Sequence, residues 1–129
     1  MIFFIGTNGA GKGQKDLKYH CNICYTWLTN SSLLQGIMGR PALKTYVNPH
    51  GIQCDLLTFS DCQEFQEAPD ATTEYTWFDG YQWRIIVCAG CGFHLGWKFE
   101  AVREALSPKE FFGILEDRLT TEIPDGEKN

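Results

Sequence analysis

The residues of this chain best suited to chemistry are four cysteines arranged as two Cys-x-x-Cys pairs, Cys21 with Cys24 and Cys88 with Cys91. Such a pair lets both sulfurs reach one metal ion from a tight turn, and two pairs complete a tetrahedral four-cysteine zinc site. Four thiolates leave no coordination position open for a substrate. We therefore expect one zinc ion per chain, with a structural rather than a catalytic role.

A disulfide framework is the alternative interpretation, because six cysteines in a small secreted chain could form three bridges. Against it, bridges within Cys-x-x-Cys pairs are usually redox-active, and a thioredoxin-type motif begins a helix in a βαβ pattern that this sequence lacks. Zinc is the favoured interpretation. The remaining cysteines, Cys54 and Cys62, have no metal-ligand spacing, and we expect buried or free thiols that a secreted form could bridge.

Three of the four tryptophans fall within a short stretch of the sequence. Trp77 and Trp83 flank an Asp79-Gly80 turn signal, and Trp97 follows the second cysteine pair, with Phe99 two residues on. A three-residue loop would pair Trp77 with Trp83 on one face of a hairpin, whereas a two-residue loop would put them on opposite faces. The four rings could pack in a core or converge on one spot as a cage.

The elements that must position these residues are short strands joined by polar turns. Residues 93–99 alternate, with Leu95, Trp97 and Phe99 on one face. Ser107-Pro108-Lys109-Glu110 has the form of a helix-capping box, so we expect a single helical turn that leads into a last strand. The expected extended segments are residues 45–47, 52–59, 74–78, 81–87, 93–99 and 111–114. The fold class is therefore mainly β.

The composition limits the class of protein. With 129 residues, 43% of them hydrophobic, the chain fits one domain, and 14% aromatic residues argue against disorder. A formal net charge of -5 leaves no basic surplus to neutralise a phosphate backbone, so we expect no nucleic-acid partner. No apolar stretch approaches the roughly 18 residues of a membrane helix, so we expect no membrane partner.

The first residues contain a near match to a phosphate-binding loop, in which Gly13 stands where a hydroxyl would bind magnesium. We interpret residues 1–18 as a flexible leader and residues 126–129 as a frayed tail, on either side of a domain at residues 19–125. The apolar segment at residues 1–5 is too short for a signal peptide. This favours the cytoplasm slightly, a secreted protein is the alternative, and the compartment stays unknown.

Several segments, taken in order, resemble the CULT family, the cereblon-type thalidomide-binding domains. The resemblance extends from about residue 19 to residue 125. It is carried by five segments with the family's spacing: Cys21-x-x-Cys24, Tyr46-Val47-Asn48-Pro49-His50-Gly51, Trp77-Phe78-x-Gly80-Tyr81-x-Trp83, Cys88-x-x-Cys91 and His94-Leu95-Gly96-Trp97-Lys98-Phe99. Any one motif could arise by chance, but five in this order are specific.

This resemblance implies a β-tent, in which two antiparallel sheets meet at an angle and are pinned by a four-cysteine structural zinc. It also implies a cage, with Trp77, Trp83 and Trp97 as three walls and Phe99 at the base, and this favours the cage over core packing. The implied ligands are cyclic imides: glutarimide or thalidomide-type molecules, uridine-like rings and the cyclic imide ends of proteins.

In the family, the polar edge of the ring bonds backbone groups, here those of Tyr75 and Thr76, and the indole N–H of the second tryptophan, here Trp83. The loop over the cage could contact whatever extends from the ring. The ligand-binding residues that the resemblance implies are Asn48, Pro49, His50, Glu74, Tyr75, Thr76, Trp77, Trp83, Trp97 and Phe99.

Two departures from cereblon limit what the resemblance implies. Cereblon has histidine where Tyr75 stands, which leaves the range of tolerated ligand tails open. Residues 1–18 are too few to hold cereblon's Lon-like domain or the helical segment that docks onto a ubiquitin ligase. We therefore expect a stand-alone member of the family, without ubiquitin ligase recruitment by this chain.

Two other functions remain as alternatives to an imide-binding module. An aromatic cage could instead hold methylated ammonium groups, and acidic residues within the cage would be its signature; Glu74 and Asp79 are the nearby candidates. A methionine sulfoxide reductase of the B type shares the tent fold and the cysteine pairs but needs a reactive cysteine further on, and none follows Cys91. We expect a binding module and no enzyme.

Overall fold

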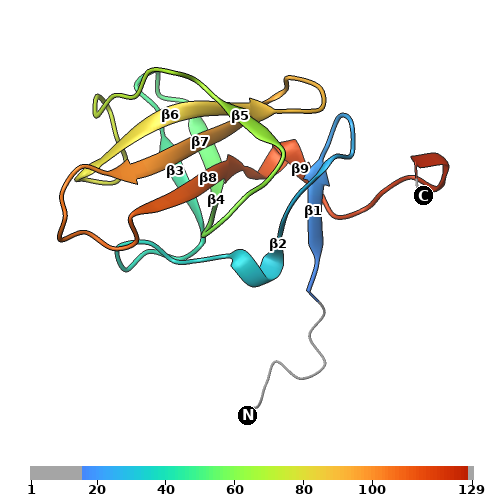
Figure 1. Cartoon of the computed structure of the whole chain (residues 1–129), viewed down its shortest axis with the longest axis horizontal. Coiled ribbons are helices and arrows are strands. Elements are labelled where there is room, and N and C mark those ends of the chain that lie inside the picture. The colour runs from blue at the N-terminus through green and yellow to red at the C-terminus, as the bar shows by residue number, and fades with distance from the viewer. Residues whose placement is uncertain (1–15, 128–129) are drawn as a thin grey trace, which may run out of the picture.

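Nine strands and three single turns of 3-10 helix, joined by loops, lie within residues 16–127, the part of the chain that the computed structural model describes (Figure 1). The strands are β1 (Lys18–Cys21), β2 (Trp27–Asn30), β3 (Leu43–Val47), β4 (Gln53–Phe59), β5 (Phe65–Glu67), β6 (Tyr81–Cys88), β7 (His94–Ala101), β8 (Glu110–Leu115) and β9 (Leu119–Thr120). The helical turns are η1 (Ser31–Leu33), η2 (Glu116–Arg118) and η3 (Asp125–Glu127).

The strands form two antiparallel sheets. Three strands in the order β2-β1-β9 make the small sheet, and six in the order β3-β4-β8-β7-β6-β5 make the large one. In Figure 1 the small sheet lies to one side of the large sheet, and η2 and β9 carry the chain from the last strand of the large sheet into the small one. The sequence-based prediction of a mainly β fold with two antiparallel sheets is confirmed.

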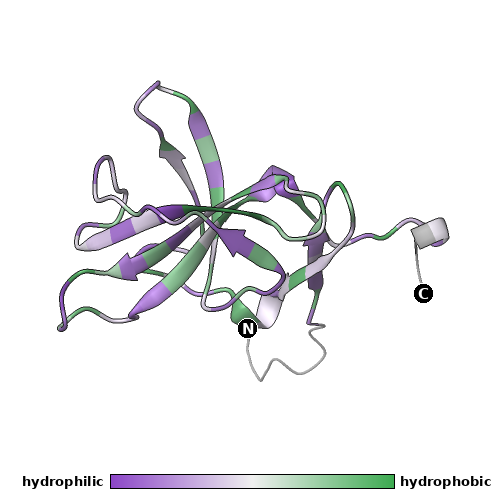
Figure 2. Cartoon of the chain, turned by 45° about the horizontal axis from the view of Figure 1, so that its top comes forward, coloured by the Kyte–Doolittle hydropathy of each residue, from purple (hydrophilic) through white to green (hydrophobic). Residues whose placement is uncertain are grey.

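One hydrophobic cluster joins the two sheets. The large sheet contributes alternate residues of its strands, and the small sheet contributes one residue from each of its three strands. Figure 2 shows hydrophobic and hydrophilic residues along the strands of both sheets. Cys21 and Cys88, one from each sheet, are buried within this cluster. Its other buried members are Leu28, Leu57, Phe59, Cys62, Ile86, Leu95, Phe112, Ile114 and Leu119.

A second cluster covers the opposite face of the large sheet and consists mainly of aromatic rings. Phe99 stacks on Phe111 with ring centroids 4.9 Å apart, and Phe78 meets both rings edge-on at the same centroid distance. Tyr46 and Tyr81 complete the buried aromatic set. Edge-on and offset ring pairs of this kind add to the free energy of burial. Part of the aromatic content thus packs a core, directly beneath the half-buried tryptophans.

A β-bulge at the start of β7 changes which face its side chains occupy. Ile86 pairs with Gly96, but Val87 pairs with His94, so Leu95 is the extra residue. The prediction that Leu95 shares a face with Trp97 and Phe99 is wrong, because Leu95 packs in the cluster between the sheets. Gly96 allows the close approach of β8, since a Cβ there would lie 2.9 Å from the Ile114 Cα.

Two further segments differ from the prediction. Residues 74–78 form turns and bends rather than a strand, and β6 pairs with β7 and β5, so Trp77 and Trp83 are not a cross-strand pair. The expected helical turn at residues 107–110 is also absent from the described chain. Two backbone carbonyls of this segment instead bond to distant residues. The Pro108 carbonyl accepts from the Tyr81 hydroxyl, and the Lys109 carbonyl accepts from the Ala101 N–H. The predicted last strand is present as β8.

At the N-terminal side, Asp16 accepts hydrogen bonds from the backbone N–H and hydroxyl of Ser32 and from the hydroxyl of Ser31, so this end is tied to η1. The glycine-rich stretch, within residues 1–15, lies outside the described residues, as do residues 128 and 129. Among the described residues there is no helix with the length and apolar character of a membrane span.

Candidate metal centre and aromatic cavity

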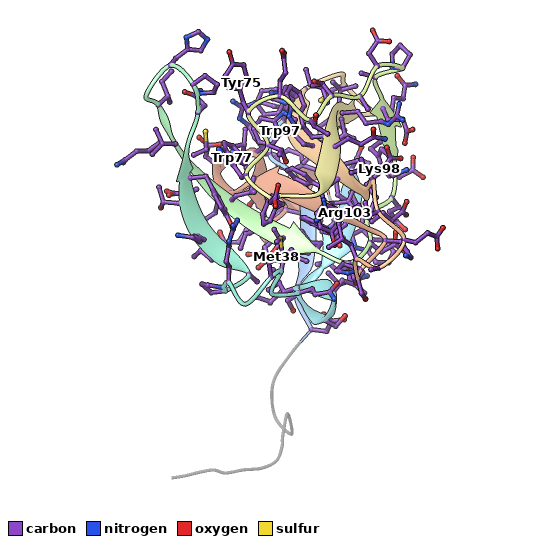
Figure 3. All side chains as sticks on the ribbon, turned by 90° about the vertical axis from the view of Figure 1, so that its left-hand side faces the viewer. Met38, Tyr75, Trp77, Trp97, Lys98 and Arg103 are labelled. Atoms are coloured by element: carbon purple, nitrogen blue, oxygen red, sulfur yellow. The ribbon has the colours of Figure 1, made fainter. Side chains whose placement is uncertain are left out.

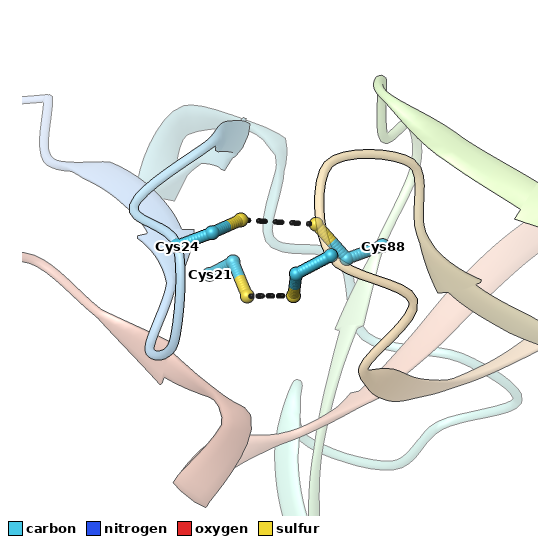
Figure 4. A group of neighbouring side chains, drawn as sticks. Cys21, Cys24 and Cys88 are labelled. Carbon is cyan, nitrogen blue, oxygen red and sulfur yellow. Dashed lines mark hydrogen bonds between the residues drawn. The ribbon is translucent and has the colours of Figure 1, made fainter.

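The four cysteines of the two Cys-x-x-Cys pairs converge where the sheets meet. Cys21 ends β1 and Cys88 ends β6, and their partners lie in the turns that follow (Figure 4). All four sulfurs lie within 4.8 Å of one another. Two separations between the pairs are 3.7 Å, from Cys21 to Cys91, and 3.5 Å, from Cys24 to Cys88. The turns therefore bring together every cysteine predicted as a metal ligand.

These distances fit a tetrahedral zinc–thiolate site. With Zn–S bonds of about 2.3 Å, the sulfurs at the corners of a tetrahedron are about 3.8 Å apart. Backbone amides also point at the sulfurs, since Ile23 N lies 3.5 Å from Cys21 Sγ and Gly90 N lies 3.3 Å from Cys88 Sγ. Such N–H donors stabilise thiolate ligands. The donor set and its geometry therefore fit a structural zinc ion.

The pKa values of the thiols indicate that a bound cation would stabilise the site. Burial raises the pKa of Cys24, but hydrogen bonds with the side chain and backbone of Thr26, and with the Cys88 and Cys91 thiols, outweigh that effect and lower it to about 7. Burial raises the pKa of Cys88, and the pKa of Cys91 rises to about 12 through desolvation and its contacts with neighbouring thiols. Four negative charges so close together repel one another. A bound cation removes that conflict and displaces the protons.

An aromatic cavity of about 380 Å³ lies on the face of the large sheet that points away from the small sheet. Figure 3 shows three of its residues, Tyr75, Trp77 and Trp97, gathered at one end of the molecule. Every residue predicted to bind a ligand lines this cavity except Glu74 and Thr76. The lining residues are Asn48, Pro49, His50, Tyr75, Trp77, Trp83, Trp97 and Phe99.

The three cavity indoles come from different segments and meet at steep angles. Trp77, in the loop before β6, meets Trp97 of β7 edge-on, with centroids 5.3 Å apart and an interplanar angle of 86°. Trp83 of β6 lies directly opposite Phe99 of β7 in the sheet, so these two share a face. All three indoles are half-buried, whereas Phe99 is only 1% exposed and lies beneath them. The rings thus form walls around a buried base.

Neighbouring residues hold the Trp77 wall in place. Tyr46 stacks on its indole at 5.0 Å, the indole Nε1 donates to the Val47 carbonyl, and Arg40 donates to the Trp77 carbonyl at 2.7 Å. Sequence reasoning did not assign Tyr46 or Arg40 to the site. Tyr46 opens the same matched stretch as Asn48, which was a usable signal, but nothing in the sequence near Arg40 pointed to it.

Residues near the two cysteine turns hold the Trp97 indole in place. The His94 ring meets the Trp97 indole edge-on at 5.3 Å, and the guanidinium of Arg118 donates to the His94 carbonyl at 2.6 Å. Arg118 also lies over the Phe93 ring, and its carbonyl accepts from the N–H of Asn22 inside the first cysteine turn. Contacts therefore connect the metal centre to the cavity.

The loop between β3 and β4 covers one edge of the cavity. The Asn48 side-chain oxygen accepts from the backbone N–H groups of His50 and Ile52, each at 2.9 Å, which closes a tight turn. Gly51 in this turn has a φ of 80°, which glycine adopts without strain. The Asn-Pro-His-Gly stretch predicted as a turn therefore holds Pro49 and His50 against the cavity.

The segment before Trp77 forms the opposite edge. Tyr75 adopts a left-handed conformation with a φ of 59° and is 71% exposed, so its ring lies at the mouth of the cavity. Glu74 contributes its carbonyl, which accepts from Trp83 Nε1 at 2.7 Å. Thr76 turns inward to bond Phe78. The indole N–H expected to meet a ligand is thus engaged by the chain itself.

A comparison with known families decides the affiliation. The family model described as "Yippee zinc-binding/DNA-binding /Mis18, centromere assembly" matches residues 17–129. The chain belongs to the Yippee-Mis18 family. The zinc-binding description of that family agrees with the four clustered sulfurs, which identifies the metal centre as a zinc site.

Among curated proteins, this Yippee-Mis18 chain is similar to cereblon. It is 35% identical to protein cereblon of Danio rerio over 109 residues, which is 84% of this chain and 25% of that protein. For cereblon of Gallus gallus the identity is 39%, over 66% of this chain and 19% of the relative, and for that of Xenopus tropicalis 41%, over 64% and 19%. The chain thus spans a quarter or less of the length of these relatives, and it is a cereblon-like domain.

Proposed function

We propose that the aromatic cavity is a non-catalytic binding site for a small flat ring with a polar edge, of which cyclic imides are the favoured class. Glutarimide and thalidomide-type molecules, uridine-like rings and the cyclic imide ends of proteins belong to this class. The observation that carries the proposal is the set of three half-buried indoles around a cavity of about 380 Å³ above buried Phe99.

The shape and lining suit such a ring. Small-molecule sites are concave and mostly apolar, with volumes from roughly 300 Å³ upwards. The faces of a five- or six-membered imide are apolar and stack on indoles, while the Trp77–Trp97 angle of 86° offers both a flat wall and an edge. A small ring that is enclosed on several sides loses most of its exposed area.

The polar edge of the ring gives selectivity. An imide presents one N–H between two carbonyls, and Tyr75, an exposed residue that lines the cavity, is placed to pair its backbone groups with such a row. An analogue that lacks the N–H would leave a desolvated acceptor unpaired, which costs about 1–3 kcal/mol. Because the Trp83 N–H already donates to Glu74, a ligand carbonyl must either share this donor or displace the Glu74 carbonyl.

The lining also favours a neutral ring over the alternative ligand, a methylated ammonium ion. Aromatic cages for cations gain from nearby carboxylates. Among the residues that line the described cavity there is no aspartate or glutamate, and Glu74, the nearest candidate in sequence, contributes its backbone carbonyl to Trp83. The methylated-ammonium reading therefore lacks its signature.

Likeness to cereblon supports the proposal only for the part of that protein that matches. We propose one structural zinc per chain and no catalytic step. We also propose no nucleic-acid partner, because the net charge of -5 leaves no overall basic surplus, although the family description includes DNA binding. Ubiquitin ligase recruitment does not form part of this proposal.

Calorimetric titration of the zinc-loaded protein tests it, with glutarimide, N-methylglutarimide and tetramethylammonium as ligands. We expect saturable binding of glutarimide, at least roughly tenfold weaker binding of the N-methyl analogue, and little heat from the cation. Binding of tetramethylammonium without any response to glutarimide would establish the alternative and end the imide proposal.

A further inference from the structure

We propose that a second cavity, next to the aromatic one, binds a cationic arm carried by the ring ligand. The inference rests on the proposed function and narrows its ligand class to rings that bear a short, positively charged substituent. The second cavity has a volume of about 520 Å³ and lies between β4, β7 and η2.

The origin of this cavity is a gap in the large sheet. Leu56 pairs with Leu115, the last residue of β8, and the chain then turns away into η2. The first half of β4, residues 53–55, therefore has no β8 partner on that side. The space opens beside β4 and is bordered on its far side by the beginning of β7.

The two cavities share walls, which makes them parts of one site. Asn48 and Trp97 line both of them. Asn48 is fixed by two hydrogen bonds within its turn, and Trp97 is held by the edge of His94, so neither wall depends on a ligand for its position. A substituent on a ring in the aromatic cavity would therefore enter the second cavity past these two residues.

The charges around the second cavity select the chemistry of the arm. Three acidic residues line it, Asp55, Glu116 and Asp117, against one basic residue, Arg118. The Asp55 carboxylate also accepts a hydrogen bond from the Thr45 hydroxyl of β3. The Arg118 guanidinium is already engaged, because it donates to the His94 carbonyl and to Asp117 and lies over the Phe93 ring. Three negative and one positive side chain give the lining a formal net charge of -2, which suits an ammonium group and disfavours a carboxylate or phosphate.

The neighbouring titratable groups do not offset this field at neutral pH. Burial lowers the pKa of His94, so the imidazole is neutral. Burial and the charges of Asp117 and Asp55 raise the pKa of Cys54, so its thiol stays protonated. The carboxylates are exposed, however, and water and salt weaken their attraction for a cation. The expected gain in affinity is therefore several-fold rather than many orders of magnitude.

The test compares three ligands on the zinc-loaded protein by calorimetry: glutarimide, a glutarimide with a short aminoalkyl arm on a ring carbon, and its N-acetylated counterpart. We expect the amine to bind roughly three- to fivefold more tightly than the acetylated ligand, and this gain to shrink at high salt. In a D55N/D117N variant the gain should disappear, while glutarimide itself binds as before. A matched E122Q variant, changed at an exposed carboxylate that lies outside both cavities, should retain the gain.

The outcomes separate the two proposals. If glutarimide binds but the amine is no tighter than the acetylated ligand, or if its advantage survives in D55N/D117N, the second cavity is not the subsite for a cationic arm. Failure of glutarimide to bind the unmodified protein overturns the proposed function, and this inference with it. Equal unfolding temperatures of the variants and the parent protein exclude misfolding as the cause of any loss.

Discussion

The indole Nε1 of Trp83 donates a 2.7 Å hydrogen bond to the backbone carbonyl of Glu74. A second tie lies beside it, because Thr72 and Trp83 form a β-bridge with two backbone hydrogen bonds. One wall of the cavity thus anchors the loop that carries Tyr75 at its apex. A ring bound against Trp83, as proposed, would therefore be coupled to the conformation of this loop.

Replacing Trp83 with alanine should remove a wall of the cavity and the anchor of this loop together. We expect glutarimide affinity to fall roughly thirtyfold or more, a loss of about 2 kcal/mol or more that is typical of a buried tryptophan contact. The half-buried position of Trp83 leaves the core rings beneath it in place, so the variant should fold and retain zinc. Calorimetry and zinc content measure the two effects.

The matched control is Trp27→Ala, because Trp27 lies on the small sheet and is 39% exposed. It should bind glutarimide like the parent protein. Unchanged affinity in Trp83→Ala would show that the ring does not bind between these indoles.

The zinc centre should be required for the stability of the whole domain. Cys88 and Cys21 belong to the cluster that joins the sheets, so we expect loss of the metal to weaken the packing of the small sheet on the large one. We expect Cys88→Ser to lose zinc and at least about 3 kcal/mol of stability, which lowers the unfolding temperature by about 10 °C or more. Cys54 lies outside the four-sulfur group, so Cys54→Ser should change neither the zinc content nor the unfolding temperature. A zinc-free Cys88→Ser protein that melts like the parent protein would contradict the structural role.

An ion-pair cluster on the large sheet predicts a pH effect. Burial alone would raise the pKa of Glu100, but hydrogen bonds from Gln82 and Arg84 outweigh it and hold the pKa below its usual value of 4.5. The folded state thus favours the carboxylate, so its contribution is complete above pH 4.5 and is lost as the pH falls through the folded-state value.

Glu100→Gln should therefore cost about 1 kcal/mol at pH 7, and this difference should narrow below pH 4.5. Urea unfolding of both proteins at a series of pH values gives the difference and cancels the shared effect of acid on the zinc thiolates. A gap that stays constant down to pH 3.5 would mean that Glu100 titrates normally.

The close contact between Gly96 and β8 predicts the effect of adding a side chain there. A Cβ at this position would collide with the Gly113 carbonyl of β8. We expect Gly96→Ala to cost about 3 kcal/mol, because two backbones would have to separate. Gly126→Ala, where a Cβ would meet nothing within 4 Å, is the control and should be close to neutral in denaturant unfolding. Equal stability of both variants would argue against the close packing of β7 on β8.

The zinc ligands were accessible to sequence reasoning because a four-sulfur site needs a fixed local spacing, and Cys21-x-x-Cys24 and Cys88-x-x-Cys91 show it. The cavity residues were reached through family resemblance, since spacing and composition alone left both core packing and a cage open. Trp77 and Trp97 approach only through the folded arrangement of a loop and a strand.

The errors have a common physical origin. The predicted face of Leu95 was wrong because one extra residue in β7 shifts the alternation of its side chains. The sequence of a single strand does not reveal such a bulge in its pairing. The turn at residues 107–110 followed local capping preferences, but tertiary hydrogen bonds to Pro108 and Lys109 outweighed them. The support of Trp77 by Arg40 depends on a contact between residues 37 positions apart.

A crystal structure of the zinc-loaded protein soaked with glutarimide tests the central claim most directly. The account predicts a flat ring enclosed by Trp77, Trp83 and Trp97 above Phe99, with its imide edge facing the backbone at Tyr75. An empty aromatic cavity at a saturating glutarimide concentration, or a ring bound elsewhere on the molecule, would contradict it.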